Sequence, residues 1–68
     1  MRTEIVAKDI ANDRVIVRTA VGIEIIFGHD TAGNVHSVMN PHGFVARSYF
    51  YDALRLAKKT FEEEAAQK

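Results

Sequence analysis

Residues 14–27 carry the strongest structural signal in this sequence, because two short aliphatic segments flank a turn that contains glycine. The segments are residues 14–19 (RVIVRT) and residues 23–27 (IEIIF), and β-branched residues of this kind favour strands. Residues 20–22 (AVG) fit a three-residue hairpin loop, in which a type I turn is followed by glycine in the left-handed conformation. The sequence therefore predicts an antiparallel hairpin here.

The length of this loop fixes which residues of the hairpin face one another. It predicts the pairs Thr19–Ile23, Arg18–Glu24, Val17–Ile25, Ile16–Ile26 and Val15–Phe27. A shift of one residue would put Val17 opposite Glu24 and mix apolar with charged positions. With the predicted register, Val15, Val17, Ile25 and Phe27 share one face of the hairpin.

Two further strands are predicted on either side of this hairpin. Residues 3–8 (TEIVAK) precede it, joined by a turn at residues 9–13, where Asp and Asn favour turn geometry. Residues 35–39 (VHSVM) follow it, after a turn at residues 30–34 with Gly33 in the left-handed conformation. The expected pairs are Val6–Ile16 and Ile5–Val17 on one side, and Ile26–Val38 and Ile25–Met39 on the other. The prediction is an antiparallel meander of three to four strands.

A long helix is predicted over residues 45–66, after residues 40–43 (NPHG) end the sheet. Its apolar residues recur at steps of three and four, which is typical of an amphipathic helix. They are Ala46, Phe50, Ala53, Leu54, Ala57, Phe61 and Ala65. This stripe is expected to pack across one sheet face, formed by Ile5, Ala7, Val15, Val17, Ile25, Phe27 and Met39. The predicted fold class is α+β, with the sheet and one C-terminal helix as two layers. Tyr49, Leu56 and Thr60 are expected at the edge of the core.

The size and composition of the chain restrict its chemistry. Sixty-eight residues suffice for a single domain, which residues 1–68 are expected to form, and domains this small are stable only marginally. The chain has no cysteine, which excludes disulfides, thiolate metal sites and a cysteine nucleophile. A second subunit is one way to stabilise such a domain. No apolar run is long enough to span a membrane, and no signal peptide is apparent, so a cytoplasmic location is expected.

The face of the sheet opposite the helix is the first candidate functional site. In the predicted register it carries an aliphatic row with charged residues beside it, where an antiparallel sheet would usually be polar. The row is Val6, Ile16, Ile26 and Val38, with Arg14 and Arg18 at its rim. Exposed apolar patches of this kind mark interaction sites, so this face is predicted to bind a second copy of the chain or another protein.

The polar face of the helix offers an alternative function. Arg47, Tyr51, Arg55, Lys58 and Lys59 lie on or near one flank of the predicted helix. A basic flank could follow a phosphate backbone, and Tyr51 could stack on an unpaired base. Charge is nonetheless balanced overall, with nine basic and nine acidic side chains, and acidic residues neighbour this flank. A nucleic-acid-binding module is therefore the alternative to protein binding.

The remaining polar residues give no strong indication of catalysis. His29, His36 and His42, with Asp30, define a histidine metal site as a second alternative, although their spacing matches no compact zinc motif. Ser37 and Ser48 have no base in an identifiable pattern, and the carboxylates suggest no acid–base pair. Gly28, Gly33 and Gly43 are spaced as turn residues. The sequence thus predicts a small non-enzymatic interaction protein that forms a homodimer and needs no cofactor.

Overall fold

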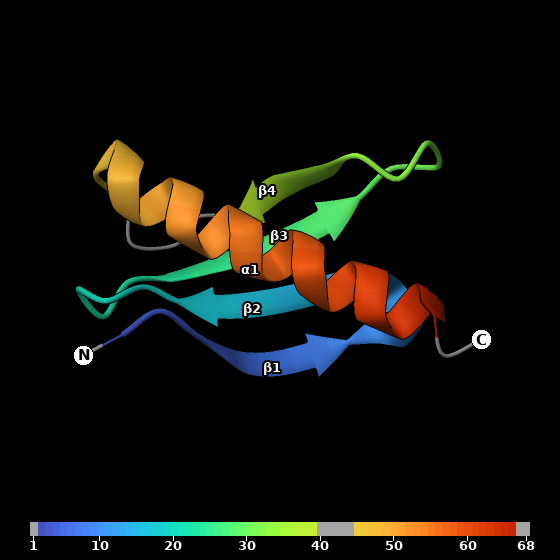
Figure 1. The fold of residues 1–68 in the computed structure, drawn as a ribbon, viewed down its shortest axis with the longest axis horizontal. Coiled ribbons are helices and arrows are strands. Elements are labelled where there is room, and N and C mark those ends of the chain that lie inside the picture. Colours follow the sequence, from blue (N-terminus) through green and yellow to red (C-terminus); the bar gives the residue numbers. More distant parts are fainter. Residues whose placement is uncertain (1, 40–44, 67–68) are drawn as a thin grey trace.

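The protein folds as a four-stranded antiparallel sheet with one long helix packed across it. The computed structural model describes residues 2–39 and 45–66. The strands are β1 (Glu4–Asp9), β2 (Arg14–Arg18), β3 (Glu24–His29) and β4 (Val35–Met39), followed by the helix α1 (Arg47–Ala66). The strands lie side by side in chain order, and α1 crosses them diagonally (Figure 1). This arrangement confirms the predicted fold class.

The central hairpin has the register that its turn predicts. β2 and β3 pair Val15 with Phe27, Ile16 with Ile26, Val17 with Ile25 and Arg18 with Glu24. The N–H of Gly22 donates to the carbonyl of Thr19 at 2.9 Å, and Gly22 has a φ of 86°, where glycine carries no steric penalty. The hydroxyl of the buried Thr19 also accepts a hydrogen bond from the N–H of Ile23 at 3.1 Å.

A β-bulge changes the expected pairing of β1. Ile5 pairs with Val17 as predicted, but Ala7 rather than Val6 pairs with Ile16, so the Val6–Ile16 prediction is wrong. The extra residue moves Ala7 to the outer face and puts Lys8 on the helix face. There the Nζ of Lys8 donates to Oε1 of Glu64 in α1 at 3.0 Å. The connection to β2 is a short 3₁₀ helix, η1 (Ile10–Asn12), capped by Asp13 at a φ of 56°.

A second irregularity displaces β4 from its expected register. The turn at residues 30–34 is as predicted, with Gly33 at a φ of 87° and Phe27 opposite Ser37. Beyond that pair the register shifts, so that Ile26 faces Met39 and the expected pairs Ile26–Val38 and Ile25–Met39 are wrong. Gly28 lies inside β3 and is not a turn residue. Val38 packs over it, with Cγ2 only 2.9 Å from where a Cβ on Gly28 would lie.

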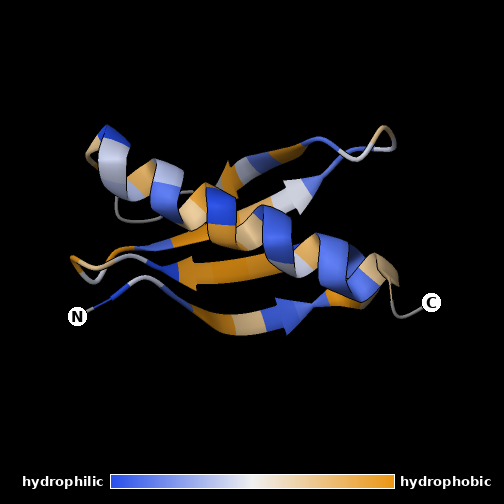
Figure 2. Cartoon of the chain, viewed as in Figure 1, coloured by the Kyte–Doolittle hydropathy of each residue, from blue (hydrophilic) through white to orange (hydrophobic). Residues whose placement is uncertain are grey.

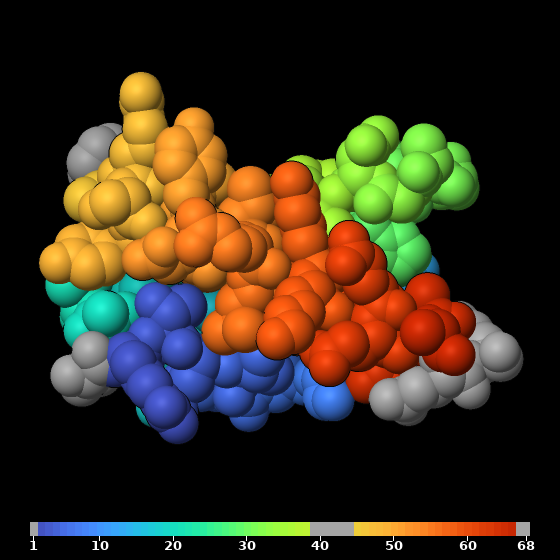
Figure 3. All heavy atoms as spheres, viewed as in Figure 1, coloured from blue at the N-terminus to red at the C-terminus, as the bar shows by residue number. Residues whose placement is uncertain are grey.

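The core lies between α1 and the inner face of the sheet. Its fully buried apolar residues are Val15, Val17, Ile25, Phe27, Ala53 and Ala57. The two alanines let the helix backbone approach the strands closely, and hydrophilic residues lie along the side of the helix that is turned away from the sheet (Figure 2). The space-filling view shows α1 covering this face between β1 and the turn that joins β3 to β4 (Figure 3).

The buried stripe of α1 is rotated from the predicted one. Ala46 and Ala65 are exposed, although both were expected in the stripe. Thr60 is instead buried, whereas an edge position was expected for it, and Leu56 is partly buried at the edge of the core as expected. Thr60 tolerates burial because its hydroxyl donates to the carbonyl of Leu56 at 2.9 Å. The apolar periodicity located the helix, but contacts with β1 and β4 set its rotation.

Candidate functional site

The outer face of the sheet carries the aliphatic row that the sequence predicts. Ile16 and Ile26 are adjacent in the two central strands and are both partly exposed. Val6 and Val38 lie in the two bulges of the outer strands and are 37% and 43% exposed. Because α1 packs on the inner face, no helix of the described residues covers this row. We call Val6, Ile16, Ile26 and Val38 the outer row.

Three residues of alternating charge, Glu4, Arg18 and Glu24, lie on neighbouring strands along one side of the outer row. Arg18 donates to Oε2 of Glu24 through Nε at 3.3 Å and through Nη2 at 3.0 Å. Its Nη1 also lies 3.5 Å from Oε1 of Glu4 on β1. The guanidinium is therefore held between two carboxylates by groups on three neighbouring strands. This arrangement fixes the position of the cation at the rim of the apolar surface.

Arg14 lies on the opposite side of the outer row. Its Nη1 donates to the carbonyls of Asn12 and Asp13 at 3.2 and 3.1 Å. The same nitrogen lies 2.8 Å from where a Cβ on Gly28 would be. The side chain is thus folded across the sheet instead of extending into solvent. Both arginines predicted at the rim lie there, one on each side of the row, because they precede and follow Ile16 on β2.

Acidic side chains lie among the basic residues of α1. Arg47, Tyr51, Arg55, Lys58 and Lys59 are all exposed. Arg55 lies 3.7 Å from Oδ1 of Asp52, while Lys58 and Lys59 border two separate grooves. Glu62 lines the first groove, and the second is lined by Glu63 and Glu64. Each lysine therefore has carboxylates beside it, and nucleic-acid binding through this flank stays a prediction.

His29 packs against α1, a contact that was not predicted from the sequence. Its ring packs edge-on against Phe61 of α1, with centroids 4.7 Å apart. Nε2 lies 3.1 Å from Oδ1 of Asp13, and Nδ1 lies 3.1 Å from the carbonyl oxygen of Asp30. Its place on β3, two residues beyond Phe27, could have indicated an inward-facing side chain. Each ring nitrogen thus has an oxygen acceptor at 3.1 Å.

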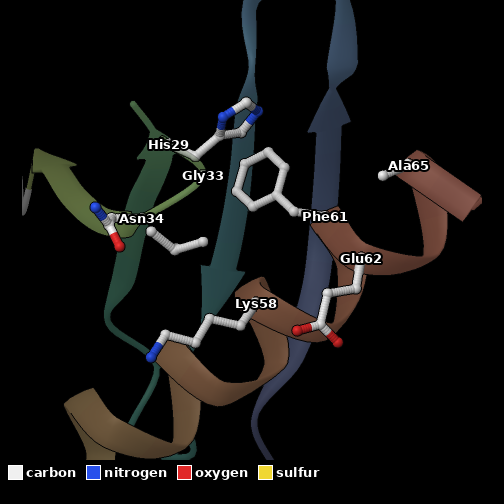
Figure 4. Close-up of a pocket in the computed structure, with 8 residues that line it drawn as sticks. His29, Gly33, Asn34, Lys58, Phe61, Glu62 and Ala65 are labelled. Atoms are coloured by element: carbon white, nitrogen blue, oxygen red, sulfur yellow. The ribbon is translucent and has the colours of Figure 1, made fainter. Parts of the chain in front are cut away.

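An open groove lies beside His29, between the end of α1 and the turn that joins β3 to β4. It has a volume of about 480 Å³. Figure 4 shows the ring of His29 next to the ring of Phe61, with Lys58 and Glu62 extending from the helix. The groove is lined by the cation of Lys58 and the carboxylate of Glu62, beside a small apolar surface. No serine, threonine or cysteine lines it among the described residues.

Asp30 organises the turn at the edge of this groove. Its Oδ1 accepts hydrogen bonds from the N–H groups of Ala32 and Asn34, both at 2.9 Å. The backbone and side-chain hydrogen bonds of Asn34 lower the pKa of Asp30 below its usual value of 3.8, and the hydrogen bond from Ala32 and the charge of His36 act in the same direction. The carboxylate thus has a structural role in the turn.

The described residues contain no cluster that would hold a metal ion. No three side chains of His, Cys, Asp or Glu come together within residues 2–39 and 45–66. His29 and His36 point to opposite faces of the hairpin, as their pairing partners Val35 and Gly28 show. His42 and Gly43 lie outside the described residues, so the third histidine of the predicted site is not placed. Ser37 and Ser48 are both exposed.

Comparisons with family models, with curated proteins and with solved structures each found no match to this chain. In the part of the chain that the structure describes, no helix combines the length and apolarity needed to cross a membrane. A function for this chain is therefore inferred from its own residues and their contacts.

Proposed function

We propose that this chain is a small non-enzymatic interaction domain that binds protein through the outer face of its sheet, and that it associates with itself. The observation that carries this proposal is the outer row, an aliphatic surface on the one sheet face that α1 leaves uncovered. The cytoplasmic location expected from the sequence remains part of the proposal.

The side chains of this face are suited to binding another protein. An apolar centre with charged groups at its rim is the usual layout of protein interfaces. Ile16, Ile26 and Val38 would provide the apolar anchors, and Arg14 and Arg18 would provide polar contacts at the edge. The strands hold these side chains in fixed positions, so little conformational entropy is lost on binding.

The test compares two substitutions of exposed valines. Val38→Asp places a charge within the outer row, and Val21→Asp places the same charge in the β2–β3 turn, where the valine is 49% exposed. Solution mass is measured by light scattering over a range of concentrations, with circular dichroism as the check on folding. We expect the wild type and Val21→Asp to associate as concentration rises, and Val38→Asp to stay monomeric.

The comparison of Val38→Asp with the wild type is decisive. Equal association by Val38→Asp and the wild type would show that the outer row is not the interface. A wild type that stays monomeric at the highest concentration would remove self-association from the proposal. Measurements in low and high salt add a further check, because an apolar interface persists when salt screens the charges.

A further inference from the structure

The outer face of the central hairpin has a symmetry that restricts how two copies could meet. Three cross-strand pairs of β2 and β3 lie on this face: Arg14 with Gly28, Ile16 with Ile26 and Arg18 with Glu24. A two-fold axis that runs between these strands, parallel to them, exchanges the two members of every pair. A symmetric dimer about this axis would therefore place unlike members of each pair against one another.

We infer that two copies of the chain join face to face about this axis, so that Arg18 of each copy pairs with Glu24 of the other. This inference rests on the proposed function and adds the arrangement and the residues that select the partner. In the same arrangement Ile16 lies on the partner's Ile26, and β1 with Val6 lies over the strand that carries the partner's Val38. Arg14 lies at the level of the partner's Gly28, over which the arginine of that copy is folded.

Charge complementarity distinguishes this axis from the other simple two-fold axis in the plane of the interface. An axis perpendicular to the strands, along the outer row, would put Arg18 against the partner's Arg14. It would also bring Glu4 to the level of the partner's Asp9, because β1 pairs Glu4 with Arg18 and Asp9 with Arg14. Like charges brought together at an interface oppose association. Only the axis parallel to the strands avoids both clashes.

The same axis brings a further pair of unlike side chains together at the outer strands. Asp9 of β1 is at the level of Arg14, and His36 of β4 is at the level of Gly28. The exchange of β1 with β4 therefore puts Asp9 opposite the partner's His36. Face-to-face packing of aligned sheets, with their mean strand directions within about 30° of each other, is a common arrangement in proteins.

The size of the face predicts a weak dimer. Strands lie about 4.8 Å apart and advance about 3.3 Å per residue, so four strands of five residues present a footprint of roughly 300 Å². This is small beside stable complexes, which bury about 1,200 Å² or more of accessible surface in total. We therefore expect the dimer to dissociate on dilution between about 1 mM and 10 µM.

The decisive experiment uses two charge reversals, Arg18→Glu and Glu24→Arg, separately and mixed. In the inferred arrangement each variant places like charges opposite one another twice, so each should weaken its own association by about tenfold or more. An equal mixture brings Glu at position 18 against Arg at position 24 of the other variant, and it should form a mixed dimer. Sedimentation equilibrium measures the masses, and circular dichroism confirms that each variant is folded.

This design separates contacts between copies from contacts within one copy. Both variants break the same internal pair between Arg18 and Glu24, so recovery on mixing can arise only across the interface. A chain with both reversals, R18E and E24R, restores the internal pair and should dimerise with itself. Mixed with the wild type, that chain should form no mixed dimer, because Arg18 of the wild type would face Arg at position 24, and this keeps the inference testable if either single variant fails to fold.

Three outcomes would overturn the inference. Stronger association of Arg18→Glu would indicate the perpendicular axis, since it would place Glu against the partner's Arg14. Unchanged association of both variants would reject the arrangement, while a monomeric Val38→Asp would still support the outer row as the interface. A wild type that is monomeric up to about 1 mM would reject the dimer itself.

Discussion

At the centre of the sheet both faces carry branched aliphatic residues, but the surroundings of these residues differ. On the inner face, Val17, Ile25 and Phe27 are completely buried. On the outer face, Ile16 and Ile26 alternate with them along the same two strands and remain partly exposed. The contrast shows that the burial of these central aliphatic residues follows the position of α1, because both faces carry branched aliphatic side chains at the centre of the sheet.

This contrast is also the reason that we propose binding for the outer face. The inner face has a helix with two buried alanines against it, which produces close packing and stability. The outer face retains a similar aliphatic character without a covering layer in the described residues. A surface of that kind lowers solubility unless it is used, which is the physical reason to assign binding to it.

The largest expected effect is the loss of a buried aromatic ring. Phe27→Ala removes a ring that is fully buried and lies 5.8 Å from the ring of Phe50, centroid to centroid. We expect a loss of about 3–5 kcal/mol in the free energy of unfolding, measured by urea denaturation at low protein concentration. Ile26→Ala, the neighbouring change on the outer face, should cost only about 1 kcal/mol because Ile26 is already partly exposed.

Equal losses from these two substitutions would contradict the assignment of the faces. They would mean that Ile26 is as well packed as Phe27 in the monomer. The low protein concentration matters, because a dimer would cover Ile26 and raise the cost of its truncation.

A second pair of substitutions tests the faces by adding volume. Ala57→Leu inserts a large side chain where α1 meets the sheet, at a residue with no exposed surface. We expect it to cost about 1–3 kcal/mol through overpacking. Ala7→Leu adds the same atoms to the exposed outer face, and its effect on the thermal unfolding of the monomer should be within about 0.5 kcal/mol. A neutral Ala57→Leu would show that the two layers are loosely packed.

A smaller effect is expected from the buried hydroxyl at the end of β2. Thr19→Val keeps the shape of the side chain but removes the oxygen that accepts from the N–H of Ile23. The loss should be about 1–2 kcal/mol in urea denaturation, since a buried donor is left with one partner fewer. Thr31→Val, in the exposed turn at residues 30–34, is the matched control and should be nearly neutral. A similar result for both would mean that the hydrogen bond adds no stability.

The smallest effect concerns Asp30, which lies on neither face. Its pKa is lowered in the folded state by hydrogen bonds from Asn34, so its ionised form stabilises the fold. This stabilisation is present above the usual pKa of 3.8 and is lost as pH falls through the lowered value. The melting temperature of the wild type should therefore fall further on acidification below pH 3.8 than that of Asp30→Asn. Identical pH dependence of the two proteins would show that the turn does not depend on this charge.

Local patterns predicted several parts of the structure correctly. The loop of residues 20–22 fixed the β2–β3 register because glycine in a three-residue turn leaves one way to pair the strands. The same reasoning placed Gly33 in its turn and put Ile16 and Ile26 side by side on the outer face. Apolar residues at helical spacing located α1 to within two residues of its observed start at Arg47.

The bulges could not be predicted because they depend on contacts between distant segments. The bulge in β1 turns Lys8 toward α1, where it meets Glu64, 56 residues along the chain. The bulge in β4 follows from the space above Gly28, which Val38 occupies. Neither partner can be recognised from the alternation of residues within one strand.

The sequence by itself therefore determined the central hairpin, its register, the presence of the helix and the alternation that creates two apolar faces. Those features depend on residues that are close together in the chain, through turn geometry and periodicity. The tertiary structure decided which residues of α1 pack against the sheet, how His29 packs against Phe61, and where the outer strands shift register. These depend on packing between layers, where the fit of side chains from distant segments selects one arrangement among several that the local patterns allow.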